Sequence, residues 1–198
     1  MPMNEIVMIL KKRENYFEEI ATMAVEDLIF LDESGAHLQM APIYGRGYGH
    51  ERIHYPVPFN RGNKLTLISA ISIHQVEAAL YGEWSANGEI FLNFIERCLC
   101  PVLSPGKVVV MDNVSFHQVH GIREAIEARG AYLLYLPAYS PDLNPIEQMW
   151  SKIKSCLRKF CARTLDAFSK AIKIAFESIH KTDLNHWYNH CGYTGSIF

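Results

Sequence analysis

The stretch that decides the fold is KVVVMD, at positions 107–112. Apart from Lys107 itself, the run Lys107–Met111 is apolar and rich in β-branched valine. Such a run is typical of a central strand buried on both faces. Asp112 ends this run, and an unpaired buried carboxylate is costly unless it takes up a proton. It therefore either turns the chain at the strand end or contacts solvent, a partner group or a cation.

Strands and helices are expected on both sides of this stretch. Short apolar runs at 27–34, 64–73 and 131–136 predict strands, and 76–81 is a further candidate. Apolar residues at helical spacing predict helices at 4–23, 87–99, 119–129, 145–157, 164–177 and 183–190. Strands first, then strands alternating with helices, predict an α/β fold with a mixed sheet flanked by helices.

The composition is that of an ordinary globular chain. Its 198 residues are 49% hydrophobic and 20% charged, which excludes an intrinsically disordered chain. No apolar run is long enough for a membrane span and no signal peptide pattern is present, so a cytoplasmic protein is expected. Five cysteines are odd in number and form no CxxC pair, which argues against a disulfide framework or a zinc site.

Positive charge is concentrated in one segment. The chain has a formal net charge of -2, yet Ser151–Lys173 holds seven Lys and Arg residues against Asp166 alone. Such a segment is either a solvated helix face or a contact for nucleic-acid phosphates. The candidate DNA contacts in it are Lys152, Lys154, Arg158 and Lys159. A second candidate set, in the Gly-rich stretch after the first strand, is Arg46, Arg52 and Arg61, with aromatic neighbours suited to stacking.

Three acids are expected to meet at one edge of the sheet. Asp32 closes the first strand, Asp112 closes the central strand, and Glu147 lies in the first turn of the helix that Asn144 and Pro145 begin. Each acid alone has a structural explanation as a turn or first-turn residue. Together they form the oxygen-ligand set that Mg²⁺ prefers, and two such ions support in-line displacement at a phosphodiester.

Three longer segments then resemble a known family. They are FLDES at Phe30–Ser34, VVVMDNVSFH at Val108–His117 and LPAYSPDLNPIEQMWSKIK at Leu136–Lys154. They resemble the DDE transposases of the mariner superfamily, in particular its bacterial insertion-sequence branch. Thirty-four residues separate Asp112 from Glu147, a spacing that this superfamily uses. The resemblance implies an RNase H-like fold, two Mg²⁺ or Mn²⁺ ions bound by the three acids, and cut-and-paste movement of a DNA element.

Neighbouring polar residues have competing interpretations. Asn113 and His117 follow the second acid at a spacing that the family also shows, so they either orient a phosphate or carboxylate near the metal ions or simply shape the chain. Asp142 is interpreted as a turn residue of SPDLNP. Glu33 should point to the opposite side of the strand from its neighbouring acid, and Trp150 should pack its helix against the sheet.

The chain is divided into a lead-in helix and linker at 1–26, a catalytic domain at 27–178 and a C-terminal helical tail at 179–198. The resemblance implies double-stranded DNA as partner, at the element ends and at the target, and a homodimer when active. It also implies a helix-turn-helix module, for which residues 1–26 leave no room. The chain is therefore interpreted as a catalytic fragment, the second frame of a split gene, or a decayed copy.

Other functions remain open from the sequence. An RNase H-like endonuclease would cut but not join DNA, and strand-transfer products would separate it from a transposase. A noncatalytic DNA-binding or regulatory remnant would show no metal-dependent cleavage. A glycosidase needs two carboxylates and has no use for the third, which argues against that class.

Overall fold

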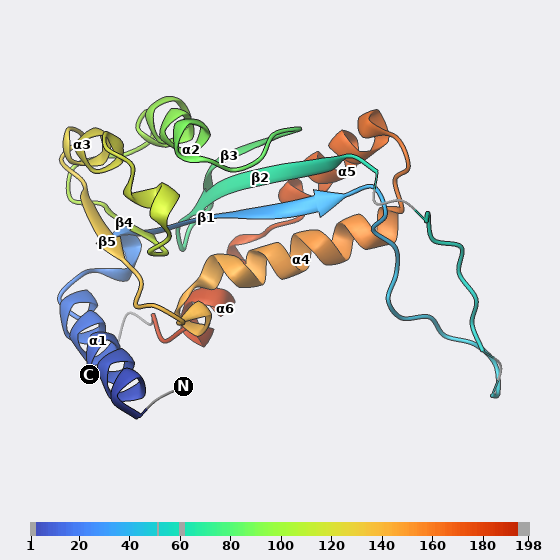
Figure 1. Cartoon of the computed structure of the whole chain (residues 1–198), viewed down its shortest axis with the longest axis horizontal. Helices are drawn as coiled ribbons and strands as arrows, with labels where there is room; N and C mark the ends of the chain where they lie inside the picture. The colour runs from blue at the N-terminus through green and yellow to red at the C-terminus, as the bar shows by residue number, and fades with distance from the viewer. Residues whose placement is uncertain (1–2, 51, 60–61, 194–198) are drawn as a thin grey trace.

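The computed structural model describes residues 3–50, 52–59 and 62–193 (Figure 1). One five-stranded sheet has the order β3-β2-β1-β4-β5. Its strands are β1 (Leu28–His37), β2 (Lys64–Ile71), β3 (Val76–Gly82), β4 (Val108–Met111) and β5 (Tyr132–Tyr135). The β1–β2 and β2–β3 pairs are antiparallel, whereas β1–β4 and β4–β5 are parallel. This is the mixed sheet that the sequence predicts.

Helices cover both faces of this sheet (Figure 1). One face carries α1 (Met3–Ile20), α4 (Pro145–Phe160), α5 (Leu165–Glu177) and α6 (Lys181–His190). The other face carries α2 (Gly88–Phe94) and α3 (Ile122–Glu127). Short helical turns complete the fold at η1 (Val25–Asp27), η2 (Ile95–Leu99), η3 (Ser115–Gln118) and η4 (Pro141–Leu143).

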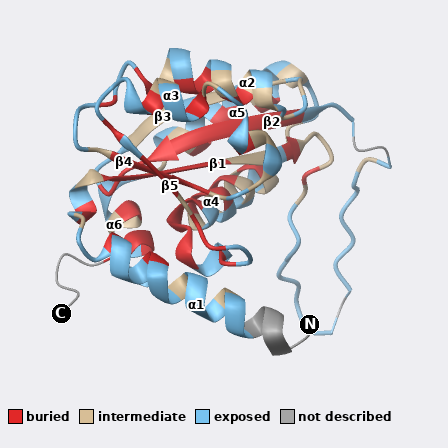
Figure 2. Cartoon of the chain, turned by 60° about the vertical axis from the view of Figure 1, so that its left-hand side comes forward, coloured by how far each residue is buried: buried red, intermediate tan, exposed pale blue. Residues whose placement is uncertain are grey.

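The central strands are buried on both sides because successive side chains point to opposite faces of a strand. In β1, Leu28 and Phe30 pack with α4, α5 and α6, while Ile29 and Leu31 pack with α2 and α3. All of β4 is buried. Figure 2 shows the result, buried central strands between helices whose outer surfaces are exposed, whereas the edge strand β3 is half-buried or exposed. The apolar runs are therefore explained by a two-sided core.

Several elements begin or end a few residues from the expected position, among them the strand at 27–34 and the helices at 87–99 and 119–129. The strand at 27–34 runs on as β1 to His37, because it pairs with β2 as far as Lys64. The helix expected at 87–99 ends as α2 at Phe94 and continues as the wider π turn of η2. The helix expected at 119–129 shortens to α3, because Gly121 has a left-handed backbone with φ of 101°.

The described residues include no helix that is long and apolar enough to cross a membrane. All five cysteines are free, as expected for a chain without a disulfide framework. Between β1 and β2 a long extended loop projects away from the sheet (Figure 1).

Candidate active site

The structure brings the three predicted acids to one cavity. Leu31 on β1 pairs with Met111 on β4, so Asp32 and Asp112 follow at the same height on neighbouring parallel strands. Glu147 lies in the first turn of α4, which packs on this part of the sheet. All three line a cavity of about 450 Å³. Asp32 does not close its strand, however, since β1 continues beside β2 after the pairing with β4 ends.

The turn before α4 forms the opposite wall of this cavity. The wall residues are Leu136, Pro137, Ala138, Tyr139, Ser140, Pro141 and Asn144, and Asn113 and Val114 line the side near β4. Asn144 occupies the N-cap position of α4 as predicted, but its side chain makes no capping hydrogen bond. Its Oδ1 is buried and, among the described residues, has no hydrogen-bond partner. Asn144 is therefore at the predicted N-cap position, but its side chain does not form the hydrogen bond that a cap normally makes.

Asp32 is a buried carboxylate in an acidic environment. Its residue is 7% exposed, and its Oδ2 accepts a hydrogen bond of 3.1 Å from Trp150 Nε1. Burial is the largest cause that raises the pKa of Asp32, and the charges of Glu33, Glu147 and Asp112 raise it further, to about 8. Trp150 packs in the core as predicted, but no sequence pattern indicated its hydrogen bond to Asp32.

Asp112 lies against a fully buried histidine. His117 Nδ1 is 2.5 Å from Asp112 Oδ1, and its Nε2 is 3.1 Å from Glu33 Oε2. Burial lowers the pKa of His117, but the bonds to Asp112 and Glu33 outweigh burial and raise it to about 9. The ring also stacks on Phe91, with 4.0 Å between ring centroids. His117 is therefore a cation held between two carboxylates on the side of the sheet away from the cavity.

The remaining polar candidates are placed as follows. Asn113 lines the cavity, and its Oδ1 accepts a hydrogen bond from Gln118 Nε2. Glu33 faces His117 and is absent from the cavity lining, as expected from strand geometry. Asp142 also lies outside the lining and pairs with Arg13.

The donor set fits a divalent cation in its chemistry. Within the described ranges, no three His, Cys, Asp or Glu side chains lie close enough to hold one metal ion. The cavity nevertheless offers three carboxylates, the oxygen ligands that Mg²⁺ and Mn²⁺ prefer. Asp112 Oδ1 is buried and accepts no hydrogen bond from the described part of the chain, so its contact with His117 is ionic. The raised pKa of Asp32 shows that burial and the neighbouring acids disfavour its charged form, which a bound cation would stabilise.

The predicted DNA contacts fall in two places away from the cavity. Lys152 is engaged by Asp183 at 2.5 Å, and Lys159 lines a different cavity, beside α6. The loop between β1 and β2 carries the exposed Arg46 and Arg52, and Tyr55 of this loop donates to Cys161 just after α4. The other members are Lys154 and Arg158, which are half-buried, and Arg61, which lies outside the described residues.

Residues 27–169 match the family described as DDE superfamily endonuclease. The chain belongs to this superfamily. Most of the DDE chain is covered by the match, including all three acids of the cavity. The match begins after α1 and ends within α5.

The Tc1 transposase is similar to part of this sequence, and the Mos1 transposase is similar in fold to the whole of this chain. The Tc1 transposase of Caenorhabditis elegans is 34% identical over 74 residues, which are 37% of this chain and 27% of Tc1. The Mos1 transposase, in its paired-end complex with the left transposon end, superposes on all of this chain with a TM-score of 0.77 at 14% identity. The chain covers 64% of that Mos1 chain. It covers 98% of the Mos1 catalytic domain solved with raltegravir and Mn, with a TM-score of 0.69 at 12% identity. The fold is thus RNase H-like, as predicted.

Proposed function

We propose that this DDE superfamily chain is the catalytic core of a transposase of the mariner superfamily, from its bacterial insertion-sequence branch. It acts in the bacterial cytoplasm, where it cleaves DNA at the ends of a mobile element and joins those ends to target DNA. One observation carries the proposal: Asp32, Asp112 and Glu147 line a single cavity of an RNase H-like fold. The partial identity with the Tc1 transposase supports the same assignment.

In this proposal the three acids hold two Mg²⁺ or Mn²⁺ ions. When bound, such ions supply Lewis-acid stabilisation of the attacking and leaving oxygens of a phosphodiester. Trp150 fixes one oxygen of Asp32 through its indole N–H, and His117 holds Asp112 from the other side of the sheet. The protein thereby orients its ligands by hydrogen bonds and charge behind the cavity, as metalloproteins commonly do.

The same cavity serves two steps. Water first hydrolyses a phosphodiester at the element end and leaves a free 3′-hydroxyl. The hydroxyl oxygen then attacks a target phosphorus, and the new P–O bond replaces the bond to the target strand's own 3′ oxygen, which leaves with a proton. Each step exchanges one P–O bond for another, so no oxidant or reductant is required.

Double-stranded DNA is the proposed partner, both as element end and as target. Mos1 was solved as a paired-end complex with a transposon end, which supports DNA as the substrate. A homodimer is the proposed active form. Arg46, Arg52, Lys154, Arg158 and Lys159 are proposed phosphate contacts, since each carries a positive charge on or near the surface. Recognition of the element ends is assigned to a separate helix-turn-helix half.

Joining of a labelled DNA end tests this function. The purified chain is incubated with supercoiled plasmid and a labelled 3′-hydroxyl end in Mg²⁺, Mn²⁺ or EDTA. Metal-dependent joining is expected for the unaltered chain and should be lost in Asp112→Asn. The matched control is Asp166→Asn, because Asp166 is exposed on α5 and pairs only locally with Lys170. Mn²⁺ binding, measured by electron paramagnetic resonance, accompanies each assay.

A DNA endonuclease without joining activity is the second candidate, favoured by the description of the family as an endonuclease. Metal-dependent nicking without joined product would select it. A chain that neither binds Mn²⁺ nor cleaves DNA would contradict both functions and leave a noncatalytic DNA-binding or regulatory protein. Equal activity of the unaltered chain and Asp112→Asn would remove the proposed acids from the mechanism.

A further inference from the structure

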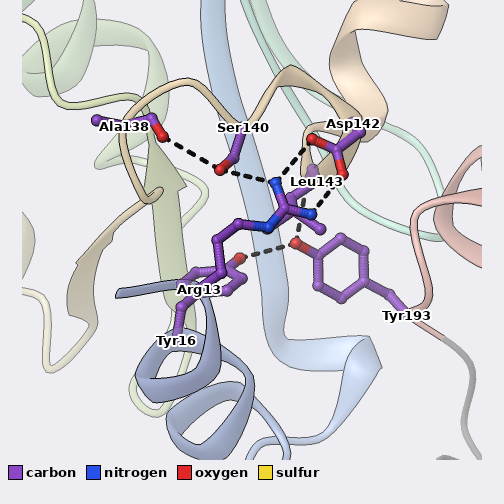
Figure 3. Close-up of polar contacts among 7 residues, drawn as sticks. All are labelled: Arg13, Tyr16, Ala138, Ser140, Asp142, Leu143 and Tyr193. Atoms are coloured by element: carbon purple, nitrogen blue, oxygen red, sulfur yellow. Dashed lines mark hydrogen bonds and ion pairs between the residues drawn. The ribbon is translucent and has the colours of Figure 1, made fainter. Parts of the chain in front are cut away.

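Two segments outside the family-matched residues contact the turn at Ala138–Leu143, which forms part of the cavity wall. One is α1, which ends at Ile20, before the match begins at residue 27. The other is Tyr193, which lies well after the match ends at residue 169. Figure 3 shows side chains from both segments reaching the turn at Ala138–Leu143.

This turn needs support from outside because its own backbone is irregular. Tyr139 has a positive φ of 57°, a conformation that non-glycine residues adopt at a cost. The Ser140 hydroxyl donates across it to Ala138 O at 3.3 Å. The turn then passes through η4 and Asn144 into α4, where Glu147 lies. Any shift of the turn therefore moves the cavity wall and the start of the helix that carries the third acid.

Arg13 of α1 holds the turn at two points. Its Nη1 donates to Ser140 Oγ at 2.9 Å and to Asp142 Oδ1 at 2.9 Å, and its Nη2 donates to Asp142 Oδ2 at 2.6 Å (Figure 3). The two parallel bonds to one carboxylate fix orientation as well as distance. The bond from Arg13 is the main cause that lowers the pKa of Asp142, so the pair stays charged at neutral pH.

A second contact fixes the far end of the same turn. Tyr193 donates from its hydroxyl to Leu143 O at 2.7 Å. Because a carbonyl oxygen can only accept, the Tyr193 hydroxyl must in turn accept the 2.8 Å bond from Tyr16 of α1. Tyr16 and Ile20 are buried in the core, which anchors α1 independently of Arg13.

We propose that Arg13 is a positioning residue for the active site: from α1 it holds Ser140 and Asp142, and so fixes the turn that places Asn144 and Glu147. This inference rests on the proposed function, because it takes Glu147 as a metal ligand. The pair contributes little to overall stability, since 25% of the Arg13 side chain and 60% of the Asp142 side chain are exposed. Loss of the pair should therefore loosen the turn without unfolding the chain.

The test compares Arg13→Gln, Asp142→Asn and the double variant in the full chain. Lys12→Gln is the matched control, because Lys12 is exposed on the same helix and loses the same charge. Mn²⁺ affinity is measured by electron paramagnetic resonance, backbone hydrogen exchange is followed at residues 137–147, and the unfolding midpoint checks the fold. We expect about tenfold weaker Mn²⁺ binding and faster exchange in Arg13→Gln, with a midpoint equal to that of the control.

The double variant decides whether Asp142 acts through Arg13. If it does, the double variant binds Mn²⁺ no more weakly than Arg13→Gln, because Arg13→Gln already removes the bonds to both Ser140 and Asp142. Exchange and affinity in Arg13→Gln equal to those of Lys12→Gln would overturn the inference, as would additive losses in the double variant. Failure of the unaltered chain to bind Mn²⁺ would instead overturn the proposed function, and the inference with it.

Discussion

Asp32 owes its orientation to a tryptophan on a distant part of the chain. Trp150 lies one turn after Glu147 on α4 and donates its indole N–H to Asp32 Oδ2. A carboxylate that is buried beside other acids favours the protonated form, which is a poor metal ligand. The indole bond stabilises the charged form on one oxygen and leaves the other for a cation.

Trp150→Phe should separate this effect from simple packing. The smaller ring leaves a cavity that lowers the free energy of unfolding by about 1–3 kcal/mol, and it removes the bond to Asp32. Mn²⁺ affinity and nicking rate should fall by about tenfold or more. Trp187→Phe on α6 is the control, since Trp187 is also buried, whereas the indole that donates to Asp32 is that of Trp150. Equal metal affinity in both variants would reduce Trp150 to a core residue.

His117 makes a second prediction at this scale. His117→Leu leaves Glu33 and Asp112 without their cation and should lower the free energy of unfolding by about 1–3 kcal/mol. The value lies below that of fully buried pairs because 21% of the Glu33 side chain and 40% of the Asp112 side chain are exposed. The double variant His117→Leu/Glu33→Leu should regain part of the lost free energy of unfolding, measured in urea. A further loss of free energy would contradict the ion-pair explanation.

Single residues show clearly what the sequence predicts and what it does not. The positions of Asp32, Asp112 and Glu147 follow from local patterns, namely an apolar run with an acid after it and a helix start. The bond that orients Asp32 comes from Trp150, 118 positions away, and His117, which contacts Asp112, is itself bonded to Glu33, 84 positions away. No local pattern encodes such pairs, because they depend on how strands and helices pack.

At the level of helices and strands, local sequence patterns predict where most of these elements lie, but they predict less well where the elements end. The β4 run and the α5 cap at Thr164 agree with the structure to within a residue. The end of β1 at His37 depends on pairing with β2, which the single strand does not encode. The left-handed Gly121 shortened α3 in the same way, since glycine permits but does not require that conformation.

The start of α4 allows a direct test of capping. Asn87 and Thr164 accept hydrogen bonds from Ile90 N at 2.9 Å and Ala167 N at 3.3 Å, whereas the Asn144 side chain caps nothing. Replacing Asn87 or Thr164 with Ala should lower the free energy of unfolding by about 1 kcal/mol. Asn144→Ala should cost less than about 0.5 kcal/mol, because it removes a buried oxygen that lacks a partner. Chemical unfolding measures the free energy of unfolding of all three variants. An equal loss in Asn144→Ala would show that the Asn144 side chain does cap α4.

Considered as a whole, the molecule folds around elements from both of its ends. Tyr16 and Ile20 of α1 and Leu184 and Tyr188 of α6 belong to the same hydrophobic cluster as the central strands. The division into a lead-in at 1–26, a catalytic domain at 27–178 and a tail at 179–198 stays a proposal. The amphipathic pattern of α1 predicted a helix but could not reveal which face of the sheet it covers.

Stability of the whole chain should depend on pH through two buried groups. The pKa of His117 is raised to about 9 from an ordinary 6.5, so its contribution is fully present below about pH 6.5 and is lost as the pH rises through 9. The pKa of Asp32 is raised to about 8, and the folded chain therefore also holds this proton more tightly than the unfolded chain does. Both groups make the metal-free protein less stable as the pH rises from about 6.5 to 9.

Divalent metal should reverse this trend, because it binds the deprotonated carboxylates that become available as the pH rises. In EDTA the unfolding midpoint should fall by several degrees between pH 6.5 and 9, since each kcal/mol shifts it by about 2–4 °C in a chain of this size. In saturating Mg²⁺ the midpoint should fall less, so the stabilisation by metal grows with pH. His117→Leu should flatten the slope in EDTA, and Asp112→Asn should abolish the difference made by Mg²⁺. A midpoint in EDTA that rises across this range would show that neither buried group governs stability as inferred, whereas a constant Mg²⁺ effect would show that metal binding is not coupled to the protonation of Asp32.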